Sequence, residues 1–410
     1  MKILAVNKFY YMKGGSEAYY FSLNNLCIEK GHEILPFSMK DEKNIDSEFG
    51  EYFIENVNYE DMSLKTKILN SAKIVYSAEA YNKIKKVARN TKPDIAHLHI
   101  FQHQLSPSII LALKKSGTPI VNTVHDLKVV CSNYKMLNSK GICEECKGGK
   151  YYKCFLNSCV KGSKLNSMVN TLEAYLHKFL KSYQYVDMYI CPSDFYRKKL
   201  IEFGIAENKT IHIPNFIDIK EFEPCYEAED YFVYMGRLSE EKGIKVLINA
   251  MNKVKVSKLY VLGTGPLESE LIKQVEDSKL SNVEFLGFKT GKELENIIKK
   301  SKFVVIPSIW YENCPMSVIE AMAYGKPVIG SDLGGIPELI EDKGTGLIFK
   351  SGDKEDLANK INYLLDNPSI CNEMGVSGRK RAEDCYDKAI HYEKINEVYN
   401  KLLKNKYEVK

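Results

Sequence analysis

The chain has 410 residues, of which 44% are hydrophobic and 27% charged, and its formal net charge is +5. This composition is typical of a soluble globular protein, and the length predicts two domains of about 200 residues each. No apolar run approaches the ~18 residues that a membrane span needs, and the opening MKILAVNKFYY lacks the apolar stretch of a signal peptide. We therefore expect a cytosolic protein whose eleven cysteines are thiols or metal ligands, not disulfides.

Apolar strands alternate with helical segments along both halves of the chain, a pattern that predicts doubly wound parallel α/β domains. In the first half the expected strands are residues 1–6, 32–38, 94–100, 119–126, 188–193 and 211–215. In the second half they are residues 230–236, 258–263, 283–287, 303–308, 327–332 and 346–350.

The alternating pattern is interrupted near Pro214, so we expect an N-terminal domain over residues 1–212 and a C-terminal domain over residues 213–386. Residues 127–165 form an insertion that is rich in lysine and cysteine and has no clear period. Its stretch from Cys131 to Lys164 holds seven lysines and two glutamates, a local excess of five positive charges.

In open parallel sheets, ligands bind beyond the carboxyl ends of the strands. After the first strand, Gly14 and Gly15 stand where a helix begins, so backbone N–H groups there can approach an anion, although an ordinary tight turn explains them equally well. His125 ends another strand at the same edge. His97 and His99 end the strand between, and by alternation we expect one of them to lie in the core.

In the second half, Arg237 and Lys242 lie between a strand end and the next helix, where two cations suit a diphosphate; a solvated charged turn is the alternative. Gly263 and Gly265 form a G-x-G turn after the following strand, which is a weak signal alone. The next strand ends in LGF, which puts backbone and Phe288 where a flat base could lie.

Two acids flank a Cys-Pro step in the stretch WYENCPMSVIE. Glu312 lies beyond a strand end, Pro315 suits the first turn of a helix, and Glu320 falls about one and a half turns into that helix. An acid on the buried face of an apolar helix needs hydrogen-bonded partners, which sugar hydroxyls could provide. A solvated helix position and a loop charge are the alternatives.

Together these segments resemble the family 4 retaining glycosyltransferases, which have the GT-B fold of two Rossmann-like domains facing across a cleft. The resemblance rests on GGSE, TVHD, GRLSEEKG, LGTGP, LGF and above all PSIWYENCPMSVIEAMAYGKPVIGSDLGGIPE. It implies an acceptor-binding N-terminal domain, a C-terminal domain that binds a nucleotide-sugar, and a terminal helix, residues 387–410, that packs back on the first domain.

The resemblance also implies roles for single residues. Arg237 and Lys242 would hold the donor diphosphate, Glu320 the ribose and Glu312 the transferred sugar, while Gly15 would let backbone reach the phosphates and His125 would touch the sugar near its reacting carbon. The implied catalytic set is His125, Arg237, Lys242 and Glu312. The implied donor site comprises Gly14, Gly15, Arg237, Lys242, Gly263, Gly265, Phe288, Glu312, Asn313, Cys314, Pro315, Met316, Ser317 and Glu320.

This family needs no divalent metal for transfer, so we expect no catalytic cofactor. The expected donor is UDP-hexose and the expected acceptor a glycan or lipid-linked oligosaccharide in surface polysaccharide synthesis. The rivals are a phosphorylase or epimerase of the same fold and a zinc-dependent nucleic-acid-binding protein. The low net charge argues against the second, and we expect no nucleic-acid partner.

Four cysteines of the insertion, Cys143, Cys146, Cys154 and Cys159, are candidate ligands of a structural zinc ion, with Cys131 as a substitute. A segment with so little apolar content needs a staple if it is ordered. Free thiols and disulfides formed on oxidation are the alternatives. The resemblance extends to this insertion, since a subset of bacterial polysaccharide-type members carries a cysteine-bearing one.

Residues 166–186 carry an apolar stripe formed by Leu172, Tyr175, Leu176, Phe179 and Leu180. Their helical spacing favours packing against the first domain. The alternative is peripheral contact with an anionic membrane on its inner face, aided by the lysines that precede the helix.

Overall fold

The computed structural model describes residues 1–56, 71–255 and 257–408 of the chain. Its contacts divide the chain into two compact units. Unit 1 comprises Met1–Ile213 together with Tyr392–Lys410, and unit 2 comprises Pro214–His391. The sequence predicts this boundary one residue earlier, between residues 212 and 213.

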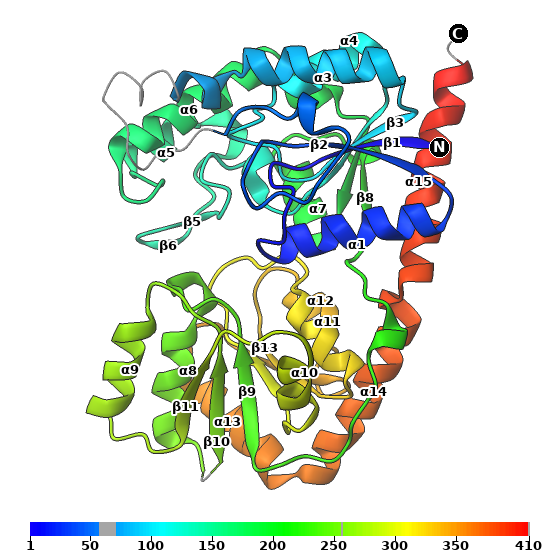
Figure 1. The fold of residues 1–410 in the computed structure, drawn as a ribbon. Coiled ribbons are helices and arrows are strands. Elements are labelled where there is room, and N and C mark those ends of the chain that lie inside the picture. Colours follow the sequence, from blue (N-terminus) through cyan, green and yellow to red (C-terminus); the bar gives the residue numbers. More distant parts are fainter. Residues whose placement is uncertain (57–70, 256, 409–410) are drawn as a thin grey trace. The chain divides into compact units, whose positions relative to one another are not determined.

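Unit 1 is built on a six-stranded parallel sheet in the order β2-β1-β3-β4-β7-β8. Figure 1 shows α3 and α4 on one side of its strands and α1 on the other. The strands are β1 (Lys2–Val6), β2 (Glu33–Phe37), β3 (Ile95–Leu98), β4 (Ile120–Thr123), β7 (Met188–Cys191) and β8 (Thr210–His212). The helices are α1 (Gly15–Glu29), α3 (Ala78–Thr91), α4 (Ser108–Ser116), α5 (Tyr152–Leu156), α6 (Lys164–Phe179) and α7 (Asp194–Glu202).

The insertion in unit 1 contains a small antiparallel pair, β5 (Leu137–Asn138) with β6 (Gly141–Ile142), and the short helix α5 that packs on α6. Short 3-10 turns link the rest of it, among them η2 (Leu127–Val129) directly after β4. Asp126 caps this turn by accepting a hydrogen bond from the backbone N–H of Lys128 at 2.9 Å.

The fit of α6 against unit 1 is the reverse of what the sequence predicts. Its buried side chains are Ser167, Val169, Asn170, Thr171, Glu173 and His177, which are mostly polar. Among the residues of the expected packing stripe, Leu172, Tyr175 and Phe179 are instead exposed. The expectation that this stripe packs on the domain is therefore wrong for these three residues, because the polar face has hydrogen-bonding partners in unit 1 and is turned inward.

Unit 2 has a second six-stranded parallel sheet, in the order β11-β10-β9-β12-β13-β14. Its strands are β9 (Tyr231–Met235), β10 (Lys258–Leu262), β11 (Val283–Gly287), β12 (Val304–Ile306), β13 (Val328–Ser331) and β14 (Gly346–Phe349). Its helices are α8 (Ile244–Ala250), α9 (Glu268–Asp277), α10 (Gly291–Lys299), α11 (Met316–Ala323), α12 (Ile336–Leu339), α13 (Lys354–Asp366) and α14 (Pro368–Tyr386).

This order is that of a dinucleotide-binding Rossmann sheet, in which the direction of strand addition reverses between the first and fourth strands. The switch point of unit 2 therefore lies between β9 and β12. Apolar clusters fill both faces of the sheet, one around Phe232 and Phe303 and the other around Val318 and Met322. These clusters fix the two strand ends from which the candidate site is built.

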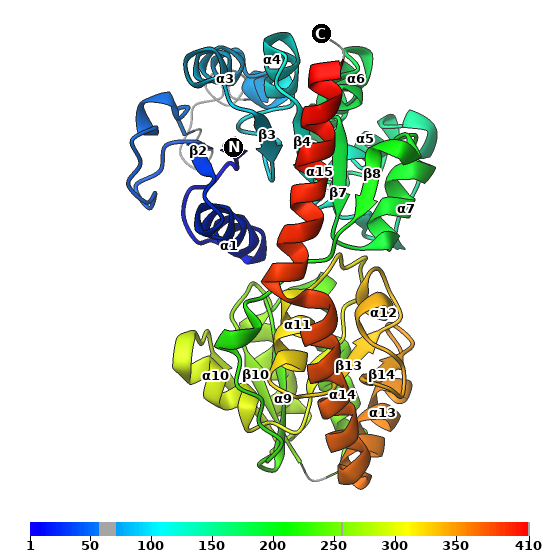
Figure 2. The ribbon, with the colours of Figure 1, turned by 90° about the vertical axis from the view of Figure 1, so that its right-hand side faces the viewer.

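The last helix, α15 (Lys388–Glu408), follows α14 directly and is drawn in red in Figure 2. Its residues from Tyr392 onward belong to unit 1. There Tyr399 is 1% exposed and its hydroxyl lies 2.6 Å from Nδ1 of His97, while the Tyr392 hydroxyl lies 2.8 Å from Nε2 of His32. None of the helices in the described ranges is long and apolar enough to cross a membrane.

Candidate functional site

A buried ion pair lies at the switch point of unit 2. Lys242 follows β9 and Glu312 follows β12, and Lys242 Nζ donates a hydrogen bond to Glu312 Oε1 at 2.8 Å. The Ser308 hydroxyl donates to the same oxygen at 2.6 Å. Glu312 is only 5% exposed. Two loops that the sequence placed at the carboxyl edge of the sheet are thus joined through a carboxylate.

Burial alone would raise the pKa of Glu312, but the charge of Lys242 and the hydrogen bonds from Lys242 and Ser308 outweigh it, so the pKa is lowered. The carboxylate is therefore ionised at neutral pH, in a place where it can only accept hydrogen bonds. Lys242 has two further N–H donors with which to meet an anion.

Arg237, the other predicted diphosphate ligand, lies in the loop after β9 and its side chain is exposed. The Tyr234 hydroxyl donates to its backbone carbonyl at 3.0 Å and so holds the loop. Within the described part of the chain, Arg237 forms no ion pair, which leaves its guanidinium accessible to a ligand.

Glu320 lies in α11 and has a different environment from Glu312. Its side chain is partly buried, and the structure gives its carboxylate no hydrogen bond or ion pair with any described residue. Burial raises its pKa. A partly buried carboxylate without a protein partner is suited to accept hydrogen bonds from a ligand.

The segment between the two acids begins helix α11. Pro315 is the N-cap, one position before the helix, and Met316 and Ser317 form its first turn. The Asn215 amide donates to the carbonyl of Cys314 at 2.8 Å and anchors the entry to the helix. Burial raises the pKa of the Cys314 thiol to about 12, so this cysteine is not a nucleophile at neutral pH. Asn313 lies in the same loop, half-buried.

Gly263 and Gly265 follow β10 in a position where packing already requires glycine. A Cβ on Gly263 would lie 2.1 Å from the carbonyl oxygen of Gly236, and one on Gly265 would lie 2.3 Å from that of Leu238. Gly263 also has a φ of +128°. The close approach of two loops therefore explains both glycines without a ligand. Their contact with a donor stays a prediction, as does that of Phe288, which is 72% exposed beyond β11.

In unit 1, Gly14 is the N-cap of α1 and Gly15 is its first residue. A Cβ on Gly15 would have no atom within 4 Å, so packing does not require this glycine. Glu17, in the first turn of α1, is 3% exposed and accepts hydrogen bonds from the Ser16 hydroxyl at 3.1 Å and the Asn7 amide at 3.4 Å. This acid, which the sequence analysis did not consider, occupies part of the positive end of the helix.

His125 contacts His99 beyond the ends of β3 and β4, with 3.1 Å between His125 Nε2 and His99 Nδ1. The ring of Tyr19 packs against His125 edge-on at 5.2 Å. Burial lowers the pKa of His125 to about 3, and burial together with the neighbouring His97 and His125 lowers that of His99. Both imidazoles are therefore neutral at physiological pH.

The expectation that only one of His97 and His99 lies in the core is wrong. Both are buried, with 1% and 2% exposed, and their rings stack at 4.4 Å. Residues two positions apart along a strand point to the same face, so alternation could not have separated them. Both ring nitrogens of His97 are hydrogen-bonded, Nδ1 with the Tyr399 hydroxyl and Nε2 with the Thr123 hydroxyl at 2.7 Å.

Lys8 and Asp126 are charged groups at the same edge of unit 1 that the sequence analysis left without a role. Burial lowers the pKa of Lys8, which Asp126 and Glu17 partly restore, and burial raises that of Asp126. The signal that could have identified Lys8 is its place just after β1, at the switch point of the sheet.

The five cysteines of the insertion are free thiols, and four of them form two pairs. The Cys131 and Cys146 thiols share a hydrogen bond, which lowers the pKa of Cys131, and the Cys154 and Cys159 thiols share another, which lowers that of Cys154. In the described ranges, no group of three or more His, Cys, Asp or Glu side chains is placed to hold a metal ion. Cys143 belongs to neither pair, and the described structure shows no assembled four-cysteine ligand set; zinc binding stays a prediction.

Two parallel Rossmann-like sheets, with acids and cations at the switch point of the second, define the GT-B class of fold. Comparisons with known proteins agree. Residues 13–221 match the family described as Glycosyltransferase Family 4, and residues 215–381 match Glycosyl transferases group 1. The chain therefore belongs to glycosyltransferase family 4.

Three similar proteins illustrate this relationship. An uncharacterized glycosyltransferase of Methanocaldococcus jannaschii is 30% identical over 53% of this chain and 60% of its own length. The O-antigen chain mannosyltransferase C of Escherichia coli is 23% identical over 99% of this chain and 100% of its own. The crystal structure of Anabaena HepE in complex with UDP-glucose covers 98% of this chain and 100% of that one, with 19% identity and a TM-score of 0.69.

The chain spans only 44–60% of the length of some curated relatives, including the one from Methanocaldococcus jannaschii. The solved structures at this level of identity support the fold alone.

The different environments of Arg237 and Lys242 predict different effects on stability. Lys242→Ala leaves the buried Glu312 carboxylate without its counter-charge; since 29% of the Lys242 side chain is exposed, we expect a loss of about 1–3 kcal/mol instead of the larger cost of a fully buried pair. Arg237→Ala, at an exposed position, should change the free energy of unfolding by less than about 0.5 kcal/mol. Urea unfolding measures both, and equal losses would contradict the assignment.

The ion pair between Lys242 and Glu312 also predicts how the unfolding free energy depends on pH. The pKa of Glu312 is lower in the folded state, so its stabilising contribution is present above its unfolded pKa of about 4.3 and is lost as pH falls through the lowered folded value. The difference in unfolding free energy between the wild type and Lys242→Ala should therefore be constant from about pH 5 to 8 and shrink in acid.

We also expect His125 to stay neutral over the range in which histidines normally titrate. Its proton signals in NMR, assigned by loss in His125→Asn, should not shift between pH 5 and 8, because burial lowers its pKa to about 3. In urea the same signals should titrate near 6.5, the ordinary value. A titration near neutral pH in the folded protein would show that His125 is solvated.

Proposed function

We propose that the protein is a retaining hexosyltransferase that moves a sugar from UDP-hexose to a glycan or lipid-linked acceptor in surface polysaccharide synthesis. The observation that carries this proposal is the pair of carboxylates beyond β12. Glu312 is held ionised by Lys242, and Glu320 has no partner among the described residues. Family membership supports a glycosyltransferase. The similarity to an O-antigen chain mannosyltransferase of Escherichia coli supports the acceptor class, and the UDP-glucose bound by Anabaena HepE supports the donor class.

In this proposal the two acids bind different parts of the donor. Glu320 accepts hydrogen bonds from the ribose hydroxyls, which provide the partners that its buried position lacks. Glu312 accepts hydrogen bonds from the transferred sugar, and its fixed negative charge also favours positive charge that develops at the reacting carbon.

The cations stabilise the leaving nucleoside diphosphate. Arg237 offers a planar set of donors to phosphate oxygens, and Lys242 adds a point charge from the side of Glu312. With these charges in place, we propose that no divalent metal is needed. The acceptor hydroxyl passes its proton to the departing phosphate oxygen, which carries the negative charge released when the bond between sugar and phosphate breaks.

The neutral imidazole of His125 suits a hydrogen bond to the donor sugar. A neutral ring can either donate or accept, whereas an imidazolium would repel the developing positive charge at the sugar. The contact with His99 fixes the orientation of the ring.

The decisive experiment incubates the protein with a panel of sugar nucleotides. For each one it measures the melting temperature of the protein and the slow hydrolysis of the sugar nucleotide. We expect UDP-hexoses to raise the melting temperature, with and without EDTA.

Glu320→Gln should weaken UDP binding in calorimetry at least about tenfold, equivalent to one hydrogen bond to a charged group. Glu312→Gln should leave UDP affinity nearly unchanged and reduce transfer about 100-fold or more. Equal effects on UDP binding would refute the division of roles, and no response to any sugar nucleotide would refute the function.

We further propose that α6 contacts an anionic membrane. Its outward face carries Leu165, Met168, Leu172, Tyr175 and Phe179, with exposed fractions from 38% at Tyr175 to 82% at Phe179. Around this stripe Lys161, Lys164, Lys178 and Lys181 are exposed. Apolar residues flanked by lysines on one side of a helix match the requirements of a bilayer surface with negative headgroups, where each lysine adds about 1 kcal/mol.

Vesicle flotation tests this contact. The full chain should bind vesicles with anionic lipid, fail to bind neutral ones, and detach at high salt. The double variant Leu172→Gln, Phe179→Gln should lose binding without loss of stability, because both side chains are exposed. The control variant Ile272→Gln, Val376→Gln removes two exposed apolar residues of unit 2 and should bind normally. If wild type binds neither kind of vesicle, or forms dimers that the α6 variant dissolves, the membrane is not the partner.

A further inference from the structure

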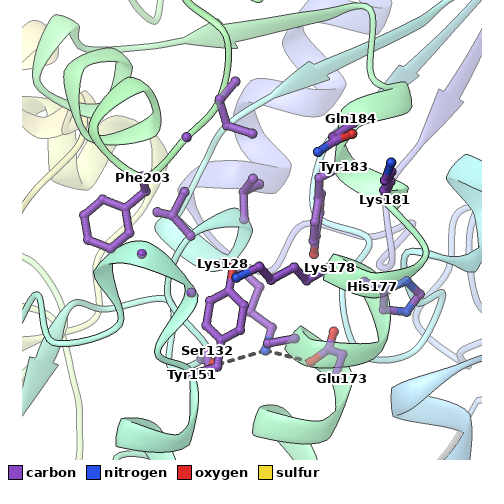
Figure 3. Close-up of a pocket in the computed structure, with 17 residues that line it drawn as sticks. Lys128, Ser132, Tyr151, Glu173, His177, Lys178, Lys181, Tyr183, Gln184 and Phe203 are labelled. Carbon is purple, nitrogen blue, oxygen red and sulfur yellow. Dashed lines mark hydrogen bonds and ion pairs between the residues drawn. The ribbon is translucent and has the colours of Figure 1, made fainter.

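A cavity of about 340 Å³ lies in unit 1 beneath the inward face of α6 (Figure 3). The insertion provides one wall through Lys128, Gly149 and Tyr151, and α6 provides another through Glu173 and Lys178. The cavity is large enough for a small polar ligand. None of the residues that line it belongs to the set that we assign to the donor.

The floor of the cavity is a buried ion pair between Lys128 and Glu173. Lys128 Nζ donates to the backbone carbonyl of Ser132 at 2.8 Å and to Asn170 Oδ1 at 2.6 Å, and it lies 2.7 Å from Glu173 Oε2. Ser132 and Asn170 thus take two of the three N–H groups of the ammonium, and its contact with Glu173 is an ion pair in which no N–H group points well at the carboxylate oxygen.

Glu173 is the unsatisfied group. It is 2% exposed, and neither of its carboxylate oxygens accepts a hydrogen bond from any residue that the structure describes. A buried carboxylate oxygen without a donor costs free energy, so a position like this one favours a ligand that brings a hydroxyl or amine. In Figure 3 the carboxylate of Glu173 lies at the base of the cavity, and the hydroxyl end of the Tyr183 side chain points toward it.

The upper part of the cavity is positively charged. Lys178 Nζ lies 5.8 Å from the centre of the Tyr151 ring and so close to Gly149 that a Cβ there would be 1.9 Å away. The absence of a side chain on Gly149 thus makes room for the ammonium. Lys181 also lines the cavity and is exposed. A ligand here meets cations at the entrance and an acceptor at the base.

One aromatic pair connects the cavity with the apolar stripe of α6. The ring of Tyr151, in the cavity wall, packs edge-on against Tyr175 at 5.4 Å, and Tyr175 belongs to the stripe. Lys178 and Phe179 are neighbours in sequence, one lining the cavity and the other the most exposed member of the stripe. The cavity and the stripe are therefore linked through neighbouring residues of one helix.

We propose that this cavity binds a polyol phosphate, with a ligand hydroxyl donating to Glu173 and the phosphate held by Lys178 and Lys181. This chemistry has two sources, the headgroup of a lipid such as phosphatidylglycerol or a soluble sugar or glycerol phosphate. The lipid source rests on the membrane contact proposed above; the soluble source does not. The Glu173 carboxylate at the bottom of the cavity favours phosphates that carry a polyol. Inorganic phosphate has no polyol that could reach this carboxylate.

The soluble arm of the test uses calorimetry on the full chain with sn-glycerol 3-phosphate, glucose 1-phosphate and inorganic phosphate. We expect at least one organic phosphate to bind fivefold or more tightly than inorganic phosphate. Glu173→Gln should remove that preference but keep phosphate binding, and Lys178→Ala should weaken all three probes. Because Glu173→Gln also disturbs a buried pair, the exposed Lys178→Ala variant, which should fold normally, keeps the test decisive.

The membrane arm compares vesicles of phosphatidylglycerol with vesicles of phosphatidylethanol. Both lipids carry one negative charge on a phosphodiester, but only the first has headgroup hydroxyls. We expect binding to phosphatidylglycerol to be at least threefold stronger, with the difference lost in Glu173→Gln. The Leu172→Gln, Phe179→Gln variant should weaken binding to both lipids alike.

The outcomes separate the proposals. Equal binding to both lipids together with no preference among soluble probes would overturn the cavity as a polyol phosphate site, while the membrane contact would stand. A preference among soluble probes without vesicle binding would support the cavity with a soluble ligand and overturn the membrane contact. In either case, UDP-hexose should raise the melting temperature of Lys178→Ala as much as that of the wild type. This response therefore tests the transferase proposal independently of the cavity proposal.

Discussion

The close contact between the loop after β9 and the loop after β12 is the constraint on which the candidate site of unit 2 depends. The two loops meet through backbone as well as side chains. Ile309 donates its N–H to the carbonyl of Glu241 at 3.0 Å, and a Cβ on Gly243 would lie 1.8 Å from the carbonyl oxygen of Pro307. The ion pair between Lys242 and Glu312 is therefore made between loops that are already in contact. Since neither side chain must be ordered from a mobile loop, the conformational cost of presenting both charges is small.

Much of the fold followed from the sequence because parallel sheets leave strong local signals. Buried strands are continuous apolar runs, and functional residues gather after their carboxyl ends, so Lys242 and Glu312 could be placed at one sheet edge from order alone. Pairing between them could not be predicted, because it depends on strand order. Only when β9 and β12 are neighbours do the loops that follow them meet. The same limit explains why Lys8 and His99 were not connected with His125.

Glycines and helical stripes each have more than one physical explanation. A G-x-G turn suggests space for a ligand, and packing gives Gly263 and Gly265 a second reason, since one loop crosses another there. An apolar stripe suggests burial, yet Phe179 is among the most exposed side chains. Both patterns describe what a segment can tolerate or prefer in isolation. Which partner it meets is decided by tertiary structure, and the polar face of α6 had such a partner while its apolar face did not.

That partner is Lys128, and it explains the reversed orientation of α6 in physical terms. A lysine that is 6% exposed needs polar partners, and α6 provides an acceptor through Asn170 and a counter-charge through Glu173. Turning the apolar face inward would bury hydrocarbon, worth roughly 1.5–3 kcal/mol per large side chain, but would leave the ammonium unpaired at a cost of several kcal/mol. His177 adds to the balance, because its ring is hydrogen-bonded to the Ser182 hydroxyl and to the carbonyl of Val75. The polar network thus fixes the inward face of the helix, and the exposed apolar stripe is its consequence. A surface produced in this way persists only if exposure is tolerated or useful, which is why the membrane contact and the cavity beneath the same helix are best tested together.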